Sequence, residues 1–257
     1  IPHQLVMTAT PIPRTLAMTA YAGLEVSVID ELPPGRKPVT TAVIAGERRP
    51  EVIERIRVAL GEKRQAYWVC PLIEESDLLE AEAAETTAAE LERQLPEFRV
   101  GLIHGRMKPA DKQAVMDAFK AGGIRLLVAT TVIEVGVDVP NASLMIIENA
   151  ERLGLSQLHQ LRGRVGRGSD SSACLLMYKP PLGQLARERL KVMRETTDGF
   201  RIAERDLELR GPGEVLGTRQ TGMLRFKVAD LARDAELVER VPGLVENLTH
   251  AQADVLI

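Results

Sequence analysis

Two arginines three residues apart are the strongest candidates for chemistry in this sequence. The segment QLRGRVGR, residues 160–167, places Arg164 and Arg167 on one side of a helical turn. The glycines between them allow the backbone to come close to a ligand. A guanidinium is planar, permanently charged and suited to phosphate oxygens, whose charge must be stabilised during phosphoryl transfer. The segment therefore predicts a phosphate-stabilising arginine pair.

The distribution of charge supports a basic site within a chain whose net charge is −3. Residues 74–97 carry nine acidic side chains against the single basic Arg93, which predicts a solvated helix face that repels DNA. Residues 152–168 instead hold Arg152, Arg162 and the arginine pair without any acid. The acidic average therefore does not exclude a nucleic-acid partner.

The composition is that of an ordinary globular protein, with 257 residues, 45% hydrophobic and 27% charged. No apolar run approaches the length of a membrane span, and the amino terminus does not resemble a signal peptide. We therefore expect a cytoplasmic protein without a membrane partner. Cys70 and Cys174 both lie in apolar runs, where we expect buried thiols and neither a disulfide nor a metal site.

Short apolar runs alternate with helical patterns from Val39 to about Tyr178. This pattern predicts an α/β fold, an open parallel sheet with helices on both faces. One helix is expected to end at Gly61, and another to begin at Pro109 and to point Val115, Met116 and Phe119 inward. Ligands gather at the carboxyl ends of such strands. The loops that begin at His104, Thr130 and Glu148 are therefore the expected functional edge.

The chain divides into three predicted parts. Residues 1–36 are interpreted as the tail of an upstream domain followed by a linker. The tail is expected because the sequence starts inside a strand-like run, LVMTA, and the linker because ELPPGRKP contains paired prolines and a glycine. Residues 37–180 form the sheet domain. Residues 181–257 form a small, mainly helical subdomain, in which TTDG separates two helical segments and a glycine-rich loop follows.

The arginine segment resembles the sixth signature motif of superfamily 2 helicases. The resemblance implies that Arg164 and Arg167 are catalytic and act on the γ-phosphate of ATP bound to a partner motor domain, and that Gln160 contacts ATP. TTVIEVGVDVP, residues 130–140, is similar to the fifth motif. The motif implies that Gly136 and Asp138 border the nucleotide. Its threonine end, Thr130 and Thr131, is implied to lie near the nucleic-acid backbone.

Two further segments agree with the family in order and spacing. TATPIPRTL, residues 8–16, resembles the third motif, which links the state of ATP to strand contacts and implies a DNA-coupling role for Thr10. HGRM occupies a loop in which the family contacts phosphates, which implies DNA contacts by His104, Gly105 and Arg106.

The carboxyl-terminal part of the sequence indicates which group of superfamily 2 helicases the chain resembles. RIAERDLELRGPGEVLGTRQTG, residues 201–222, resembles the translocation element shared by the RecG family and the transcription-repair coupling factors called Mfd. This element implies that Arg189, Arg210 and Gln220 couple motor closure to movement on duplex DNA. YWVCPLIEES and LGTRQTG look closer to the RecG family. The resemblance therefore implies a RecA-like second motor domain of an ATP-dependent helicase for branched DNA, such as stalled forks and Holliday junctions.

The sequence contains no GxxxxGK followed by Ser or Thr, so it has no phosphate cradle of that kind. We expect ATP and Mg²⁺ to be bound mainly by a first motor domain, and this chain alone to be inactive as an ATPase. The expected partners are forked or branched duplex DNA and the upstream motor and wedge domains of the same protein, which is expected to act as a monomer. The alternatives are an Mfd-like translocase and a non-catalytic module that binds nucleic acid.

Two further patterns resemble functional sites but are interpreted otherwise. VIDEL, residues 28–32, resembles a magnesium-binding box but follows the third motif, whereas the family places that box before it. His159 lies beside the arginine pair, and a turn histidine that hydrogen-bonds to a neighbour is preferred over a catalytic base.

Overall fold

The computed structural model describes residues 27, 29, 37–71, 77–130, 139–168 and 171–210. The chain divides into two compact units, residues 31–202, and residues 1–30 with 203–257. The domain boundaries predicted at 36/37 and 180/181 stay a prediction.

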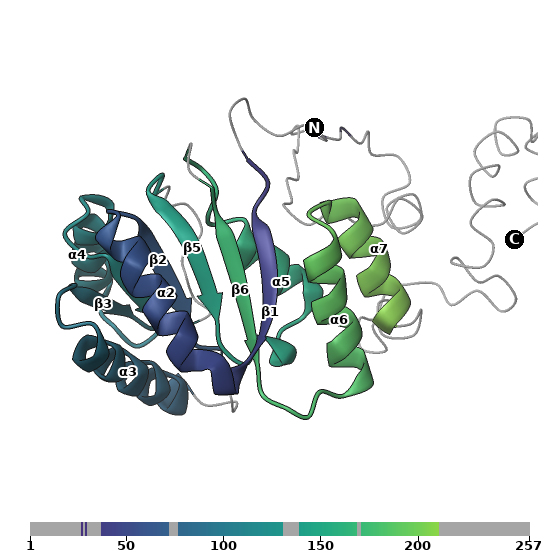
Figure 1. Cartoon of the computed structure of the whole chain (residues 1–257), viewed down its shortest axis with the longest axis horizontal. Helices are drawn as coiled ribbons and strands as arrows, with labels where there is room; N and C mark the ends of the chain where they lie inside the picture. The colour runs from purple at the N-terminus through teal and green to yellow at the C-terminus, as the bar shows by residue number, and fades with distance from the viewer. Residues whose placement is uncertain are drawn as a thin grey trace, which may run out of the picture. The chain divides into compact units, whose positions relative to one another are not determined.

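Six strands and the helices between them alternate along the chain, as the sequence predicted (Figure 1). The elements are β1 (Thr40–Ala45), η1 (Gly46–Arg48), α2 (Arg49–Gly61), β2 (Gln65–Val69), α3 (Asp77–Gln94), β3 (Val100–Ile103), α4 (Pro109–Lys120), β4 (Leu126–Ala129), β5 (Ala142–Ile147), η2 (Ala150–Arg152), α5 (Leu155–Arg162), β6 (Ala173–Tyr178), α6 (Gln184–Glu195) and α7 (Gly199–Arg210).

All six strands form one parallel sheet in the order β1-β6-β5-β2-β4-β3. The inner strands are buried on both faces, which explains why β2, β4 and β5 are almost continuously apolar. The predicted fold class, an open parallel α/β sheet, is confirmed. No helix in the described part of the chain combines the length and apolar character that a membrane span requires.

The two faces of the sheet are covered by different helices. Trp68 of β2 is fully buried in a cluster with residues of α2 and α3 such as Ile53 and Leu91. Its neighbour Tyr67 points to the other face, where the centroid of its ring lies 5.0 Å from the ring centroid of Phe119 in α4. Figure 1 shows α2 and α3 in front of the sheet and α5 behind it. The sheet therefore separates two apolar layers.

Some expectations about burial need correction. Phe119 is fully buried, but Val115 and Met116 of the same helix are only half-buried, because the apolar face of α4 lies at the margin of the sheet next to the edge strand β3. Both cysteines are buried, as expected.

Truncating Phe119 tests the layer between α4 and the sheet. We expect Phe119→Ala to destabilise the chain by about 3–5 kcal/mol, because it removes a fully buried ring and leaves a cavity. Urea unfolding followed by the fluorescence of Trp68, the single tryptophan, measures the change. Val58→Ala is the control, since Val58 is 64% exposed on α2. Equal midpoints for the two variants would contradict this packing.

Candidate functional site

The loops predicted to be functional begin at the carboxyl ends of β3, β4 and β5, which lie along one edge of the sheet. Beyond the strands, Cys70 N donates to Ala129 O at 2.8 Å, and Glu148 N donates to Val69 O at 2.9 Å. Thr130 N similarly donates to Ile103 O at 3.2 Å, next to the loop that begins at His104. These backbone bonds extend the parallel ladder past the strand ends. The expectation that the loops after β3, β4 and β5 share an edge is confirmed.

The turn after α5 carries the arginine pair. Leu155, Leu158 and Leu161 are buried and fix the helix against the sheet. After the helix, Arg164 N donates to Leu161 O at 3.0 Å, and fully buried Val165 anchors the turn. Gly166 then adopts a φ of +79°, and a Cβ there would lie 2.8 Å from Val39 Cγ2. Only glycine fits this position without strain, so the path of the chain between the two arginines is fixed.

The two guanidinium groups of the pair differ in exposure. Arg164 is half-buried and Arg167 is exposed. Burial, followed by the charge of Arg167, lowers the pKa of Arg164. The Arg164 side chain has no hydrogen bond or ion pair with a carboxylate among the described residues. The site therefore presents two neighbouring positive charges, an arrangement that an anion would stabilise.

Sequence reasoning missed the role of Arg162 within the same motif. Its side chain is buried and hydrogen-bonds to Thr41, His159 and two backbone carbonyls, so it does not belong to an exposed basic site. A signal was available, because Leu155, Leu158 and Arg162 lie at the i, i+3 and i+7 positions of one helix face.

Of the two roles considered for His159, the structure favours a hydrogen bond to a neighbour over a catalytic base. Its Nδ1 lies 3.1 Å from Nη2 of Arg162. Burial and the charge of Arg162 lower its pKa, so the neutral ring accepts this hydrogen bond. His159 therefore hydrogen-bonds to a neighbour as expected, but it lies within α5 and not on a turn.

The loop after β3 exposes Gly105 and Arg106. The His104 side chain is only 12% exposed, with Nε2 3.4 Å from Glu85 Oε1 and with Nδ1 buried and unpartnered among the described residues. Lys112 Nζ donates to Gly105 O at 3.1 Å, which ties the loop to α4. Among the predicted phosphate contacts of this loop, Arg106 and the backbone of Gly105 are the accessible ones.

The remaining predicted site residues fall into two groups. Gln160 is exposed, Thr130 is 1% exposed with Oγ1 unpartnered in the described part of the chain, and half-buried Arg189 donates from Nη2 to Glu151 O at 2.9 Å. Their roles stay predictions. The other predicted positions lie outside the described residues: Thr10, Thr131, Gly136, Asp138, Gln220 and the side chain of Arg210.

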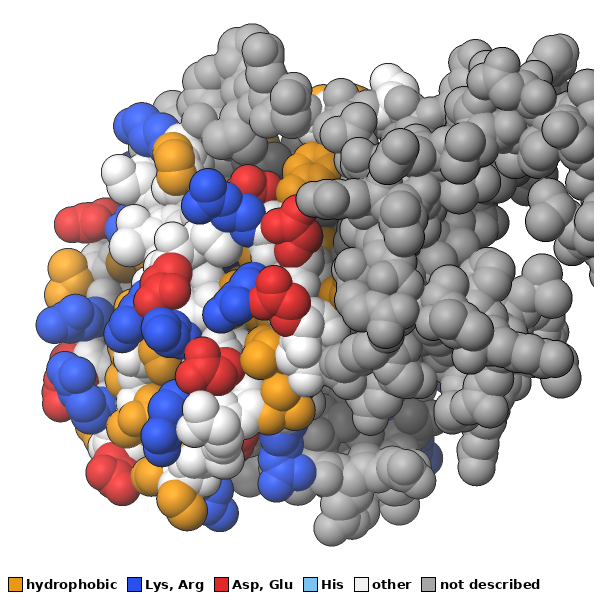
Figure 2. All heavy atoms as spheres, turned by 90° about the vertical axis from the view of Figure 1, so that its right-hand side faces the viewer, with side chains coloured by type: hydrophobic (Ala, Val, Ile, Leu, Met, Phe, Trp, Pro, Cys, Tyr) orange, Lys and Arg blue, Asp and Glu red, His pale blue; other side chains and the backbone are white. Residues whose placement is uncertain are grey.

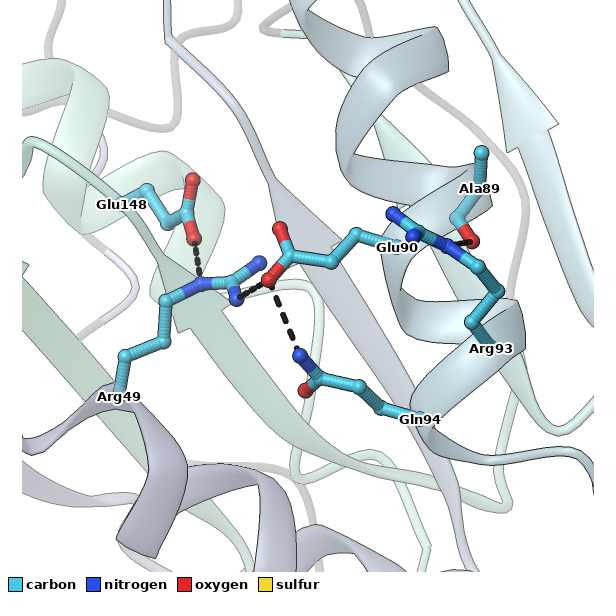
Figure 3. Close-up of polar contacts among 6 residues, drawn as sticks. All are labelled: Arg49, Ala89, Glu90, Arg93, Gln94 and Glu148. Carbon is cyan, nitrogen blue, oxygen red and sulfur yellow. Dashed lines mark hydrogen bonds and ion pairs between the residues drawn. The ribbon is translucent and has the colours of Figure 1, made fainter.

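An ion network holds the loop that leads from β5 towards the arginine pair (Figure 3). Arg49, the first residue of α2, donates from Nε to Glu148 Oε1 and from Nη1 to Glu90 Oε1, both at 2.8 Å. Its guanidinium also lies over the Trp68 ring at 5.1 Å. Burial opposes the charge of Arg49, but the hydrogen bonds and charges of the two carboxylates outweigh it and raise the pKa of Arg49. The network joins α2, α3 and the end of β5.

Positive charge does not dominate the described part of the face shown in Figure 2. In the view of Figure 2, the described Lys and Arg side chains are interspersed with Asp and Glu. Contacts of this face with phosphates would therefore depend on individual positions.

Comparisons with known proteins show which families this chain is similar to. Residues 49–169 match the family described as helicase conserved C-terminal domain, and residues 196–255 match ATP-dependent DNA helicase RecG, domain 3, C-terminal. Proteins named ATP-dependent DNA helicase RecG are similar: that of Pasteurella multocida (strain Pm70) is 67% identical over 99% of this chain, and that of Bacillus subtilis (strain 168) is 46% identical over 98%. The chain spans 37% of the length of each.

A solved structure also matches, described as RecG bound to a three-way DNA junction. It is 47% identical with a TM-score of 0.70, and the match covers 90% of this chain and 30% of that one.

Glu148→Gln tests whether the Arg49 network stabilises the loop. We expect a loss of about 1–3 kcal/mol, because a charged hydrogen-bond acceptor with 18% exposure is removed. Urea unfolding followed by Trp68 fluorescence measures it. Glu51→Gln is the matched control, since Glu51 also pairs with an arginine, Arg48, at 2.7 Å but is 57% exposed, and its midpoint should not change. Equal effects of the two variants would show that burial does not strengthen the network.

Proposed function

Because this chain belongs to the RecG family of helicases, we propose that it forms the second half of an ATP-driven motor that moves on duplex DNA. In the longer protein, its arginine pair would face ATP held by a first motor domain. The observation that carries the proposal is the fixed turn at Arg164 and Arg167. The half-buried guanidinium of Arg164, which has no carboxylate partner among the described residues, lies there beside the charge of Arg167.

The proposed chemistry is stabilisation of charge. ATP with Mg²⁺ would supply the phosphoryl group, and Arg164 and Arg167 would donate hydrogen bonds to its oxygens as negative charge develops. Arginine suits this task because its guanidinium stays protonated even where burial lowers its pKa. Gln160, Gly136 and Asp138 are proposed to border the nucleotide. This chain is proposed to need the first motor domain for hydrolysis.

DNA contacts are proposed at the loop edge of the sheet. Arg106 is exposed there, and backbone N–H groups near Gly105 suit phosphate oxygens. His104, Thr130, Thr131 and Thr10 are proposed to support this grip. Arg189, Arg210 and Gln220 are proposed to couple it to motor closure.

The proposed substrate is forked or branched duplex DNA, in the remodelling of stalled forks and Holliday junctions. The similarity to a RecG structure bound to a three-way DNA junction supports this choice. The match of residues 196–255 favours RecG over an Mfd-like translocase. We propose that the protein acts in the cytoplasm as a monomer, with its upstream motor and wedge domains.

Arg164→Ala and Arg167→Ala in the full-length protein test the catalytic assignment. Each is expected to lower kcat for DNA-stimulated ATP hydrolysis roughly 10³-fold or more, because charge at the transferred phosphate loses a donor. Affinity for forked DNA should stay within about twofold, since the pair contacts phosphate of the nucleotide. Arg55→Ala, on the exposed side of α2, is the control. Near-normal turnover of Arg167→Ala would refute the assignment.

Arg106→Ala tests the DNA contact. The slope of log K against log salt concentration for forked DNA should become shallower by about 1, as expected for one lost phosphate contact. Arg99→Ala is the matched control, because Arg99 and Arg106 are both exposed and flank β3 at its opposite ends. An equal change in slope for both variants would show that the loop edge is not the DNA-binding edge.

A further inference from the structure

Arg162 carries a buried charge without a carboxylate partner among the described residues. It is the last residue of α5 and only 3% exposed. Burial lowers the pKa of its guanidinium; Cys174 opposes this shift, and no carboxylate contributes to it. A charge this deeply buried normally has an acidic partner, because desolvation is costly.

Backbone carbonyls at the end of α6 take the place of that partner. Nη1 of Arg162 donates to Met193 O and to Thr196 O, both at 2.9 Å, and to Thr41 Oγ1 at 3.3 Å. The last carbonyls of a helix lack partners within the helix and carry partial negative charge. The guanidinium therefore satisfies carbonyls at the carboxyl end of α6, and neutral His159 accepts a hydrogen bond from its Nη2.

The same residue belongs to the turn that carries the arginine pair. Val165 N donates to Arg162 O at 3.3 Å, and Arg164 N donates to the carbonyl of the preceding residue, Leu161. The side chain of Arg162 is thus fixed to α6 and β1, while its backbone forms part of the turn. A shift of Arg162 would move Arg164 with it.

The charge of Arg162 calls for an explanation beyond stability. Replacing a buried charged group by an apolar side chain of similar volume is often neutral or stabilising. A methionine would fill much of this space but would form no hydrogen bond to the end of α6. What the guanidinium adds is therefore a set of hydrogen bonds that fixes the distance between α6 and the arginine turn.

We propose that Arg162 is a positioning residue, which locks the turn bearing Arg164 and Arg167 to the carboxyl end of α6 and so sets the orientation of the arginine pair. This inference rests on the proposed function. Arg162 does not contact the nucleotide. It acts through the pair. Beyond Thr196, α6 leads into α7, whose start is capped by Asp198: its Oδ1 accepts a hydrogen bond from Phe200 N at 2.8 Å.

Arg162→Met and Arg162→Lys in the full-length protein test this role. With Met, kcat of the DNA-stimulated ATPase should fall about 100-fold, as for a misplaced catalytic group, while KM for ATP and affinity for forked DNA stay within about twofold. Lys keeps the charge but not the fork of donors, so kcat should fall roughly tenfold. Arg194→Met is the matched control, an exposed arginine of α6, and should keep its kcat within about twofold.

A second readout separates positioning from loss of fold. Affinity for ADP with aluminium fluoride, which imitates the transferred phosphate, should weaken in parallel with kcat, whereas affinity for ADP alone should not change. A kcat that falls only with the folded fraction, measured by thermal unfolding, would overturn the inference, as would full turnover in Arg162→Lys. If wild type lacks ATPase or Arg167→Ala keeps it, the proposed function fails. If both behave as proposed and Arg162→Met matches Arg194→Met, this inference alone fails.

Discussion

The fixed backbone of the turn that carries Arg164 and Arg167 is the constraint on which the proposed site depends. Burial, followed by the charge of Arg167, lowers the pKa of Arg164, so the turn must be fixed by contacts other than those of the pair itself. Buried Val165, the left-handed conformation of Gly166 and the buried guanidinium of Arg162 supply those contacts. The pair is therefore preorganised before any anion arrives, which is the condition for stabilising charge in a transition state.

The parallel sheet relates this pair to a second set of loops. Parallel pairing brings the ends of β3, β4 and β5 to one edge, and the Arg49 network fixes the segment that leaves β5. That segment continues through η2 into α5, which ends at the arginine turn. One continuous stretch of chain therefore connects the buried strand β5, the loop held by the Arg49 network and the arginine turn.

Hydrophobic periodicity in the sequence correctly predicted the buried strands. The burial of the charged residue Arg162 was not predicted. The short apolar runs predicted buried parallel strands, and β5 is fully buried from Ala142 to Ile147. Arg162 was counted with its neighbours as part of a basic site, because charge type predicts exposure on average. Only the tertiary fold brings the end of α6 to Arg162. Thr130 was expected near DNA, yet its side chain is buried, which composition does not reveal.

The central claim is that the arginine pair completes a site whose phosphate cradle belongs to another domain. Mixing this chain with the separately produced upstream part of its longer protein, in the presence of forked DNA and ATP, tests the claim most directly. The account predicts ATP hydrolysis that needs both parts, rises with the concentration of this chain until it saturates, and disappears when this chain carries Arg167→Ala. Equal hydrolysis by the upstream part alone, or by the mixture with Arg167→Ala, would contradict it.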